Sequence, residues 1–220
     1  MNSFDELLHH YGSDKANIFR KNNSLGHGFS KFYEQQLIHL KDKEINVLEI
    51  GSYAGASAAA IKKYFPNSKI CCLDINISNF IYTSRDINVY GLDIKNKKNL
   101  ENILKKINND LKIDYFDIII DDGSHYLGDI LLGIKNLFKC LKQKGVYIIE
   151  DYKHPNYYDY NKNIDHILID ELLIHLEKKF FFKSNILTEN DQSFLFKNIK
   201  KIKVFKGNLK DSDICFIEKI

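Results

Sequence analysis

Short apolar runs alternate with longer amphipathic segments through the middle of this chain. Five runs have the length and apolar content of buried strands, and they cover residues 45–50, 69–74, 87–90, 115–120 and 146–149. Between them, apolar residues recur at helical spacing in segments 55–64, 96–109 and 126–142. Alternation of this kind predicts a parallel sheet with helices on both faces.

The two ends of the chain follow other patterns. Segments 3–11 and 29–40 predict helices. The polar, Gly- and Asn-rich segment 12–28 between them is longer than most loops, and long loops often serve as lids or binding segments. A disordered surface loop is the alternative interpretation of this segment.

Near the C-terminus, a predicted helix over 162–178 is followed by apolar runs at 199–205 and 214–217. The turn-rich Lys206-Gly207-Asn208 begins their short connection, which predicts an antiparallel hairpin and not a crossover. We therefore expect two parts: an N-terminal helical segment and lid loop over residues 1–40, and one α/β domain over residues 41–220.

Composition narrows the classes of partner. The 32 basic and 29 acidic residues give a net charge of +3, and the lysines are scattered, so neither a nucleic acid nor a membrane is expected. None of the four cysteines forms a CxxC pair, which favours free thiols in a reducing cytoplasm. The N-terminus has no signal-peptide pattern, and no apolar run approaches the ~20 residues that span a bilayer. We expect a cytoplasmic protein.

The turn after the first predicted strand carries the first chemical signal. Residues 47–57 read VLEIGSYAGAS, an apolar run followed by a glycine turn and an Ala-rich helix start. A dinucleotide-binding turn needs Gly-x-Gly-x-x-Gly, but Tyr53 and Ala56 stand where the second and third glycines belong. The sequence therefore disfavours a pyrophosphate-binding turn.

The same turn, E-x-G-x-x-x-G-x-S, resembles motif I of the class I S-adenosylmethionine (SAM) dependent methyltransferases. The resemblance implies a Rossmann-like α/β fold: a doubly wound, mostly parallel, seven-stranded sheet with a C-terminal antiparallel hairpin. It implies SAM as cofactor, with Glu49 helping to hold the methionine end of SAM. It also assigns Gly51, Gly55 and Ser57 to the SAM-binding turn.

Three further acids are candidates for SAM contacts. Asp74 ends the second strand, where a carboxylate can accept both ribose hydroxyls; a surface aspartate that caps the strand is the alternative. The resemblance places Asp93 near the adenine. Asp121 is assigned to the cofactor side and not to a metal, with support of the local turn as its alternative role.

Two acidic pairs close the fourth and fifth strands: Asp121-Asp122 and Glu150-Asp151. If these strands are neighbours, their carboxylates meet at one sheet edge, where unpaired carboxylates raise each other's pKa. A divalent ion removes that repulsion, and oxygen ligands suit Mg²⁺ or Mn²⁺. His125 lies three residues after Asp122, within reach to remove a proton from a metal-bound hydroxyl. A structural histidine is the alternative.

Here the resemblance becomes narrower, because the chain resembles the metal-dependent sugar O-methyltransferases of macrolide biosynthesis. The matching residues are Gly12-Ser13-Asp14-Lys15, His27, Tyr33-Glu34, the Asp122-x-x-His125 motif and Glu150-Asp151. By this resemblance Asp122, Glu150 and Asp151 would bind Mg²⁺ and His125 would be the general base. The long N-terminal extension of the macrolide enzymes has no counterpart here, so their acceptor and assembly are not carried over.

The expected function is methyl transfer from SAM to a hydroxyl of a sugar or glycosylated metabolite, assisted by Mg²⁺. The Tyr- and Asn-rich segment 152–160 suits a saccharide acceptor or a packed surface loop equally. Three alternatives remain: a metal-independent SAM methyltransferase acting on another small molecule, an NAD-linked oxidoreductase, and a SAM-binding protein without catalysis. The oligomeric state, including a homo-oligomer, is left open by the sequence.

Overall fold

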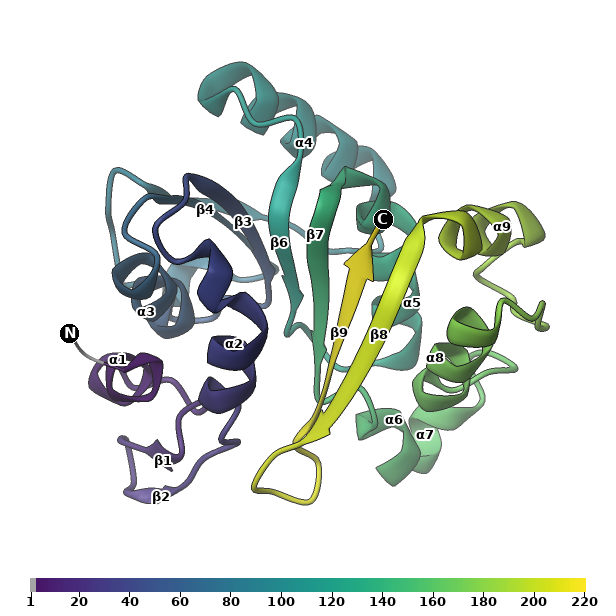
Figure 1. Cartoon of the computed structure of the whole chain (residues 1–220), viewed down its shortest axis with the longest axis horizontal. Helices are drawn as coiled ribbons and strands as arrows, with labels where there is room; N and C mark the ends of the chain where they lie inside the picture. Colours follow the sequence, from purple (N-terminus) through teal and green to yellow (C-terminus); the bar gives the residue numbers. More distant parts are fainter. Residues whose placement is uncertain (1–2) are drawn as a thin grey trace.

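The computed structural model describes residues 3–220, and its centre is a seven-stranded sheet (Figure 1). The strand order is β5-β4-β3-β6-β7-β9-β8, and all neighbours from β5 to β7 are parallel. Strand β9 runs antiparallel between β7 and β8. The strands are β3 (Ile45–Ile50), β4 (Ser68–Asp74), β5 (Ile87–Gly91), β6 (Phe116–Asp121), β7 (Leu141–Glu150), β8 (Ile199–Lys206) and β9 (Asp213–Lys219). The expected sheet and C-terminal hairpin are therefore confirmed.

Helices cover both faces because the buried strands carry apolar side chains on both sides. Val47, Ile118 and Ile148 pack on one face with α1 (Phe4–Tyr11), α2 (Ser30–Leu37) and α3 (Ala56–Tyr64). Leu48, Ile119 and Ile149 pack on the other with α4 (Lys97–Leu111), α5 (Leu127–Leu137), α8 (Ile169–Lys178) and α9 (Glu189–Asn198). The two apolar cores on opposite faces fix the register of the strands.

Segment 12–28, called the lid below, is folded. It contains a small antiparallel pair, β1 (Ile18–Phe19) and β2 (Ser24–Leu25). Backbone N–H groups of Gly28 and Phe29 donate to the carbonyls of Ala16 and Lys15 and continue this pairing. The connection between β8 and β9 reaches the lid, where the Asn208 N–H donates to the His27 carbonyl at 2.8 Å. Pairing of the segment's own backbone explains why a polar segment without apolar periodicity is ordered.

Some predicted helix boundaries were wrong. The helix predicted over 126–142 ends as α5 at Leu137 and passes through η3 (Phe138–Cys140) into β7, because Leu141 pairs with Phe116 and is buried. The helix predicted over 162–178 is split: α7 (Asp159–Lys162) ends before a turn, and α8 starts at Ile169. Helix α6 (His154–Tyr157), helix α9 and the short turns η1 (Ile38–Leu40) and η2 (Ile77–Asn79) were not predicted as such.

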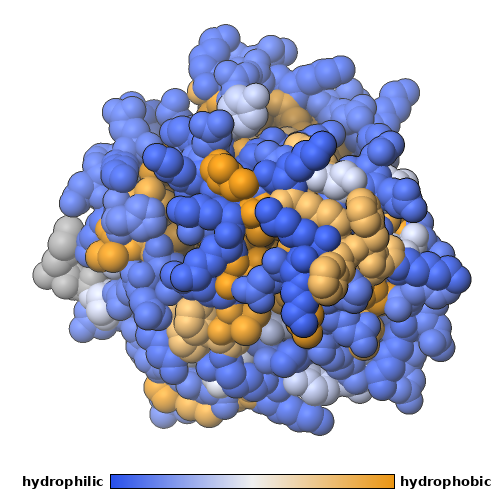
Figure 2. Space-filling view, turned by 45° about the vertical axis from the view of Figure 1, so that its right-hand side comes forward, coloured by the Kyte–Doolittle hydropathy of each residue, from blue (hydrophilic) through white to orange (hydrophobic). Residues whose placement is uncertain are grey.

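The exposed edge of the sheet is protected by charge. Strand β8 lies at this edge and carries Lys200, Lys201, Lys203 and Lys206, a device that discourages pairing with other chains. Figure 2 shows the side on which β8, α8 and α9 lie; it is mostly hydrophilic, with hydrophobic side chains near its middle. Within residues 3–220 no helix has both the length and the apolar character needed to cross a bilayer.

Candidate active site

A cavity of about 730 Å³ opens at the carboxyl ends of β3, β4 and β6, and residues of segment 12–28, among them Gly12, Lys15 and Phe19, line part of its wall. Gly51 allows the backbone after β3 to approach the backbone after β6 closely. Its φ is +81°, and an added Cβ would lie only 1.9 Å from the Asp122 carbonyl oxygen. Gly55, also at φ +81°, lies just before the N-terminus of α3. The turn therefore brings backbone against the cavity where a larger residue would not fit.

Glu49 lies under this turn, and its carboxylate lacks hydrogen-bond partners. Its side chain is 0% exposed, and neither carboxylate oxygen has a hydrogen-bond partner within residues 3–220. Burial raises the pKa of Glu49, and the nearby ammonium of Lys15 opposes that effect. The buried hydroxyl of Ser57 on the first turn of α3 also has no partner within the described chain. An unpartnered buried carboxylate fits a polar ligand with hydrogen-bond donors; of the two residues, Ser57 lines the cavity and Glu49 lies behind it.

The predicted SAM contacts Asp74, Asp93 and Asp121 line the cavity, as do Gly51 and Ser57, whereas Glu49 and Gly55 do not. Asp74 accepts the Tyr53 N–H at 2.7 Å through one oxygen and the Asn76 N–H at 2.8 Å through the other, which leaves lone pairs for a ligand. Asp93 lies at the cavity beyond β5. Asp121 lies under α5 and accepts the Tyr147 hydroxyl at 3.3 Å, and its burial raises its pKa to about 7.

Strands β6 and β7 are neighbours, so the acidic strand ends meet as expected. The His125 Nε2 atom lies 3.8 Å from an Asp122 oxygen and 4.0 Å from an Asp151 oxygen. One ligand atom from each of the three residues lies within 4.8 Å of the other two. His125 and Asp151 both have left-handed backbones, with φ of 57° and 50°. Such strained conformations outside glycine cluster at functional sites.

Glu150 is placed differently from the other acids. Its side chain is buried, with one oxygen accepting the Tyr33 hydroxyl and the other accepting the Lys15 ammonium, each at 2.5 Å. The same ammonium also contacts Asp122. Burial lowers the pKa of Lys15, but Asp122 and Glu150 outweigh this and raise it well above its ordinary value. Glu150 is therefore near the cluster but is occupied by side chains from the lid and α2.

Sequence reasoning assigned no role to Lys15, Tyr33 or His27, although all three belong to motifs that carried the resemblance. The His27 Nδ1 atom lies 3.2 Å from Asp151 and 2.9 Å from the Ser212 hydroxyl. Burial lowers the pKa of His27, yet contact with Asp151 outweighs burial and raises it to about 9. The available signal for a role at the site was the presence of these three residue types, lysine, tyrosine and histidine, in motifs of the N-terminal segment.

The chemistry of this donor set fits a divalent cation. Asp122 and Asp151 present carboxylate oxygens beside an imidazole, with the Glu150 carboxylate next to them. Oxygen-rich sets of this kind suit Mg²⁺ or Mn²⁺ better than Zn²⁺. The lysine between Asp122 and Glu150 shows that the folded chain already places a cation against these charges.

Comparison with known proteins agrees with this geometry. No protein-family model matches the chain. Mycinamicin VI 2''-O-methyltransferase of Micromonospora griseorubida is 29% identical over 132 residues, which cover 57% of this chain and 31% of that protein. L-olivosyl-oleandolide 3-O-methyltransferase of Streptomyces antibioticus is 30% identical over 154 residues, covering 67% and 36%. The chain thus spans about a third of the length of these relatives.

Among solved structures, the methyltransferase MycE of mycinamycin biosynthesis, in complex with Mg, SAH and mycinamycin VI, superposes with a TM-score of 0.74. The match covers 99% of this chain and 54% of MycE at 21% identity. At that identity the likeness establishes the fold. The chain is therefore similar in sequence to macrolide and sugar O-methyltransferases and has the methyltransferase fold of MycE.

Proposed function

We propose that this chain transfers a methyl group from SAM to a hydroxyl of a sugar or glycosylated small molecule, with Mg²⁺ bound. The observation that carries the proposal is the pairing of two features at one sheet edge. One is the buried, unpartnered Glu49 carboxylate under the cavity. The other is the cluster of Asp122, His125 and Asp151 beside it.

The cavity supplies the methyl donor site. Glu49 accepts hydrogen bonds from the α-ammonium of SAM, Asp74 accepts from the ribose hydroxyls, and Asp93 contacts the adenine. Gly51, Gly55 and Ser57 form the turn beside the methionine part, and Asp121 supports it from below. The lid covers the donor and limits access of water. In support, all of these residues except the buried Glu49 and Gly55 line the cavity.

The neighbouring cluster supplies the acceptor site. Asp122, Glu150 and Asp151 would hold Mg²⁺, which when bound lowers the pKa of a coordinated hydroxyl. His125 removes the hydroxyl proton as the oxygen attacks the methyl carbon. Its left-handed backbone directs the ring toward Asp122 and Asp151, within 4.0 Å of both. The same cluster lies next to the cavity, as in-line transfer from a bound sulfonium requires.

Calorimetry with S-adenosylhomocysteine (SAH) and NAD tests the donor assignment. We expect micromolar binding of SAH and no binding of NAD. Binding of NAD alone would instead support an oxidoreductase, which the failed dinucleotide turn and the inserted strand β9 disfavour.

A chelator titration tests the metal. We expect EDTA to abolish methyl transfer to a panel of glycosides and added Mg²⁺ to restore it, while SAH affinity stays within about twofold. Turnover that survives EDTA would assign His125 a metal-independent role. SAH binding without turnover on any acceptor would favour a SAM-binding protein without catalysis.

A further inference from the structure

Lys15 is the most unusual charged residue of the molecule. The residue is only 2% exposed, although it belongs to the polar lid. Its ammonium bridges Asp122 after β6 and Glu150 at the end of β7. Among the lysines of residues 3–220, it alone pairs with two acidic side chains. Burying an ammonium is costly unless it is paired, so the two carboxylates hold it in place.

Lys15 occupies oxygens that a divalent ion would need. Each oxygen of Glu150 already accepts one hydrogen bond, one from Tyr33 and one from Lys15, and the Lys15 ammonium lies between Glu150 and Asp122, the position that an ion bridging these two carboxylates would take. The remaining place for an ion is the cluster of Asp122, His125 and Asp151. There the ion would share Asp122 with the ammonium, and two cations that share one partly buried carboxylate repel each other.

We propose that Lys15, which lies in the lid, competes with the divalent ion for Asp122 and Glu150. In the absence of the ion the Lys15 ammonium contacts both carboxylates, and the ion binds by displacing it. This inference rests on the metal-dependent function proposed above. The long, flexible side chain of lysine allows the movement, and the cavity that Lys15 already lines gives it space.

Displacement of Lys15 would couple metal binding to the order of the lid. The Lys15 carbonyl accepts the Phe29 N–H, and the neighbouring Ala16 and Asn17 carbonyls accept the N–H groups of Gly28 and Gly26. The ionic contact of Lys15 therefore anchors the lid's backbone pairing to the ends of β6 and β7. Metal binding removes this anchor, and by linkage a firmly anchored lid weakens metal binding by the same factor.

Titration with Mn²⁺ alone, followed by electron paramagnetic resonance, tests the competition. Lys15→Met keeps the length of the side chain and removes the charge, and we expect it to bind Mn²⁺ about tenfold or more tightly than the wild type. Lys31→Met is the matched control, because exposed Lys31 on α2 has the same charge and no ion pair in the described chain. We expect its Mn²⁺ affinity to change less than about twofold. Unchanged or weaker binding by Lys15→Met overturns the inference.

Amide hydrogen exchange on the wild type is a second test that needs no variant. We expect saturating Mg²⁺ to speed exchange at Gly26, Gly28 and Phe29, whereas unchanged or slower exchange overturns the inference. If neither the wild type nor Lys15→Met binds Mn²⁺, the inference and the metal assignment both fail. The donor assignment is then decided separately by calorimetry with SAH.

Discussion

At the scale of the residue, the buried carboxylate of Glu49 lowers the stability of the fold. A fully buried carboxylate without a hydrogen-bond partner destabilises a protein, and a neutral amide in its place costs less. We expect Glu49→Gln to raise the melting temperature by ~2 °C or more. It should also weaken SAH binding by about 10–100-fold, because a charge-assisted hydrogen bond is lost. Calorimetry measures both, with exposed Glu44→Gln as control; unchanged SAH affinity would remove Glu49 from the donor site.

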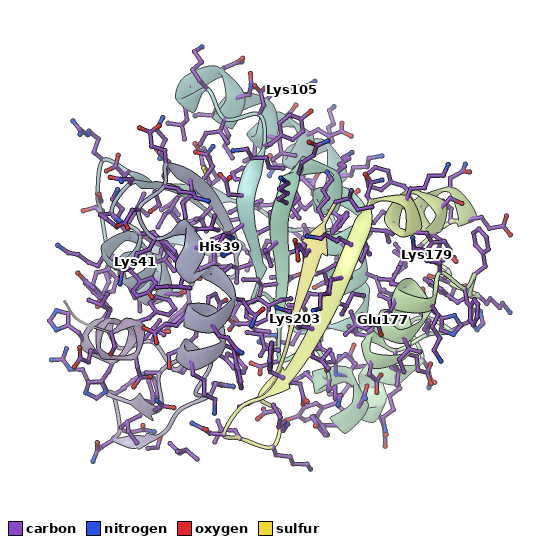
Figure 3. All side chains as sticks on the ribbon, viewed as in Figure 1. His39, Lys41, Lys105, Glu177, Lys179 and Lys203 are labelled. Atoms are coloured by element: carbon purple, nitrogen blue, oxygen red, sulfur yellow. The ribbon has the colours of Figure 1, made fainter. Side chains whose placement is uncertain are left out.

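His125 is the second residue whose role can be isolated. Asparagine tolerates the left-handed backbone at this position, so His125→Asn removes the imidazole with little strain. We expect turnover to fall by ~10²-fold or more, the usual size of a general-base effect, with SAH affinity unchanged. His39→Asn is the control, since His39 lies in η1, directly after α2 and away from the lid (Figure 3). Normal turnover of His125→Asn would exclude His125 as the base.

At the scale of the element, one buried amide joins α7 to the turn that carries His125. Asn161 is 1% exposed; its oxygen accepts the Leu127 N–H at 3.2 Å, and its nitrogen donates to the His125 carbonyl at 3.5 Å. We expect Asn161→Ala to lower the free energy of unfolding by about 1–3 kcal/mol, measured by urea denaturation. Turnover should fall about tenfold with SAH affinity kept, because the His125 turn loosens. Exposed Asn163→Ala should change neither; equal effects of both variants would contradict this role.

The elements that were predicted well are those whose burial is set by local pattern. Strand β3 was predicted at its observed bounds because its run is apolar on both faces. Helix α9 was missed because only Gln192, Leu195 and Phe196 of it are buried. Its capping box between Thr188 and Asp191 was an available start signal. The lid hairpin had no such signal, since its order comes from backbone pairing and from the β8–β9 connection.

At the scale of the whole molecule, the sequence predicted which strand ends meet but not which side chains touch. Parallel neighbours place their carboxyl ends at one edge, which brought Asp122, His125 and Asp151 together. Lys15 and Glu150 are 135 residues apart, and their pairing depends on how the lid folds over the sheet. The direction of the Lys15 side chain thus decides which carboxylates stay open to a ligand. No local sequence pattern encodes that direction.

The contact between the two ends of the chain gives the last prediction. Asn208, in the β8–β9 connection, donates its side-chain amide to the Gly26 carbonyl at 3.3 Å, across 182 residues of sequence. We expect Asn208→Ala to speed amide exchange in the lid and to weaken SAH binding about 3–10-fold, because ordering a looser lid over the donor costs more entropy. The melting temperature should change little, since the backbone bond from Asn208 to His27 remains. Asn198→Ala, just before the other end of β8, also removes a hydrogen bond from a side-chain amide to a backbone carbonyl, and it should leave SAH affinity unchanged. Faster lid exchange with unaltered SAH affinity would mean that the lid does not hold the donor, and the C-terminal hairpin would then stabilise the lid without acting on binding.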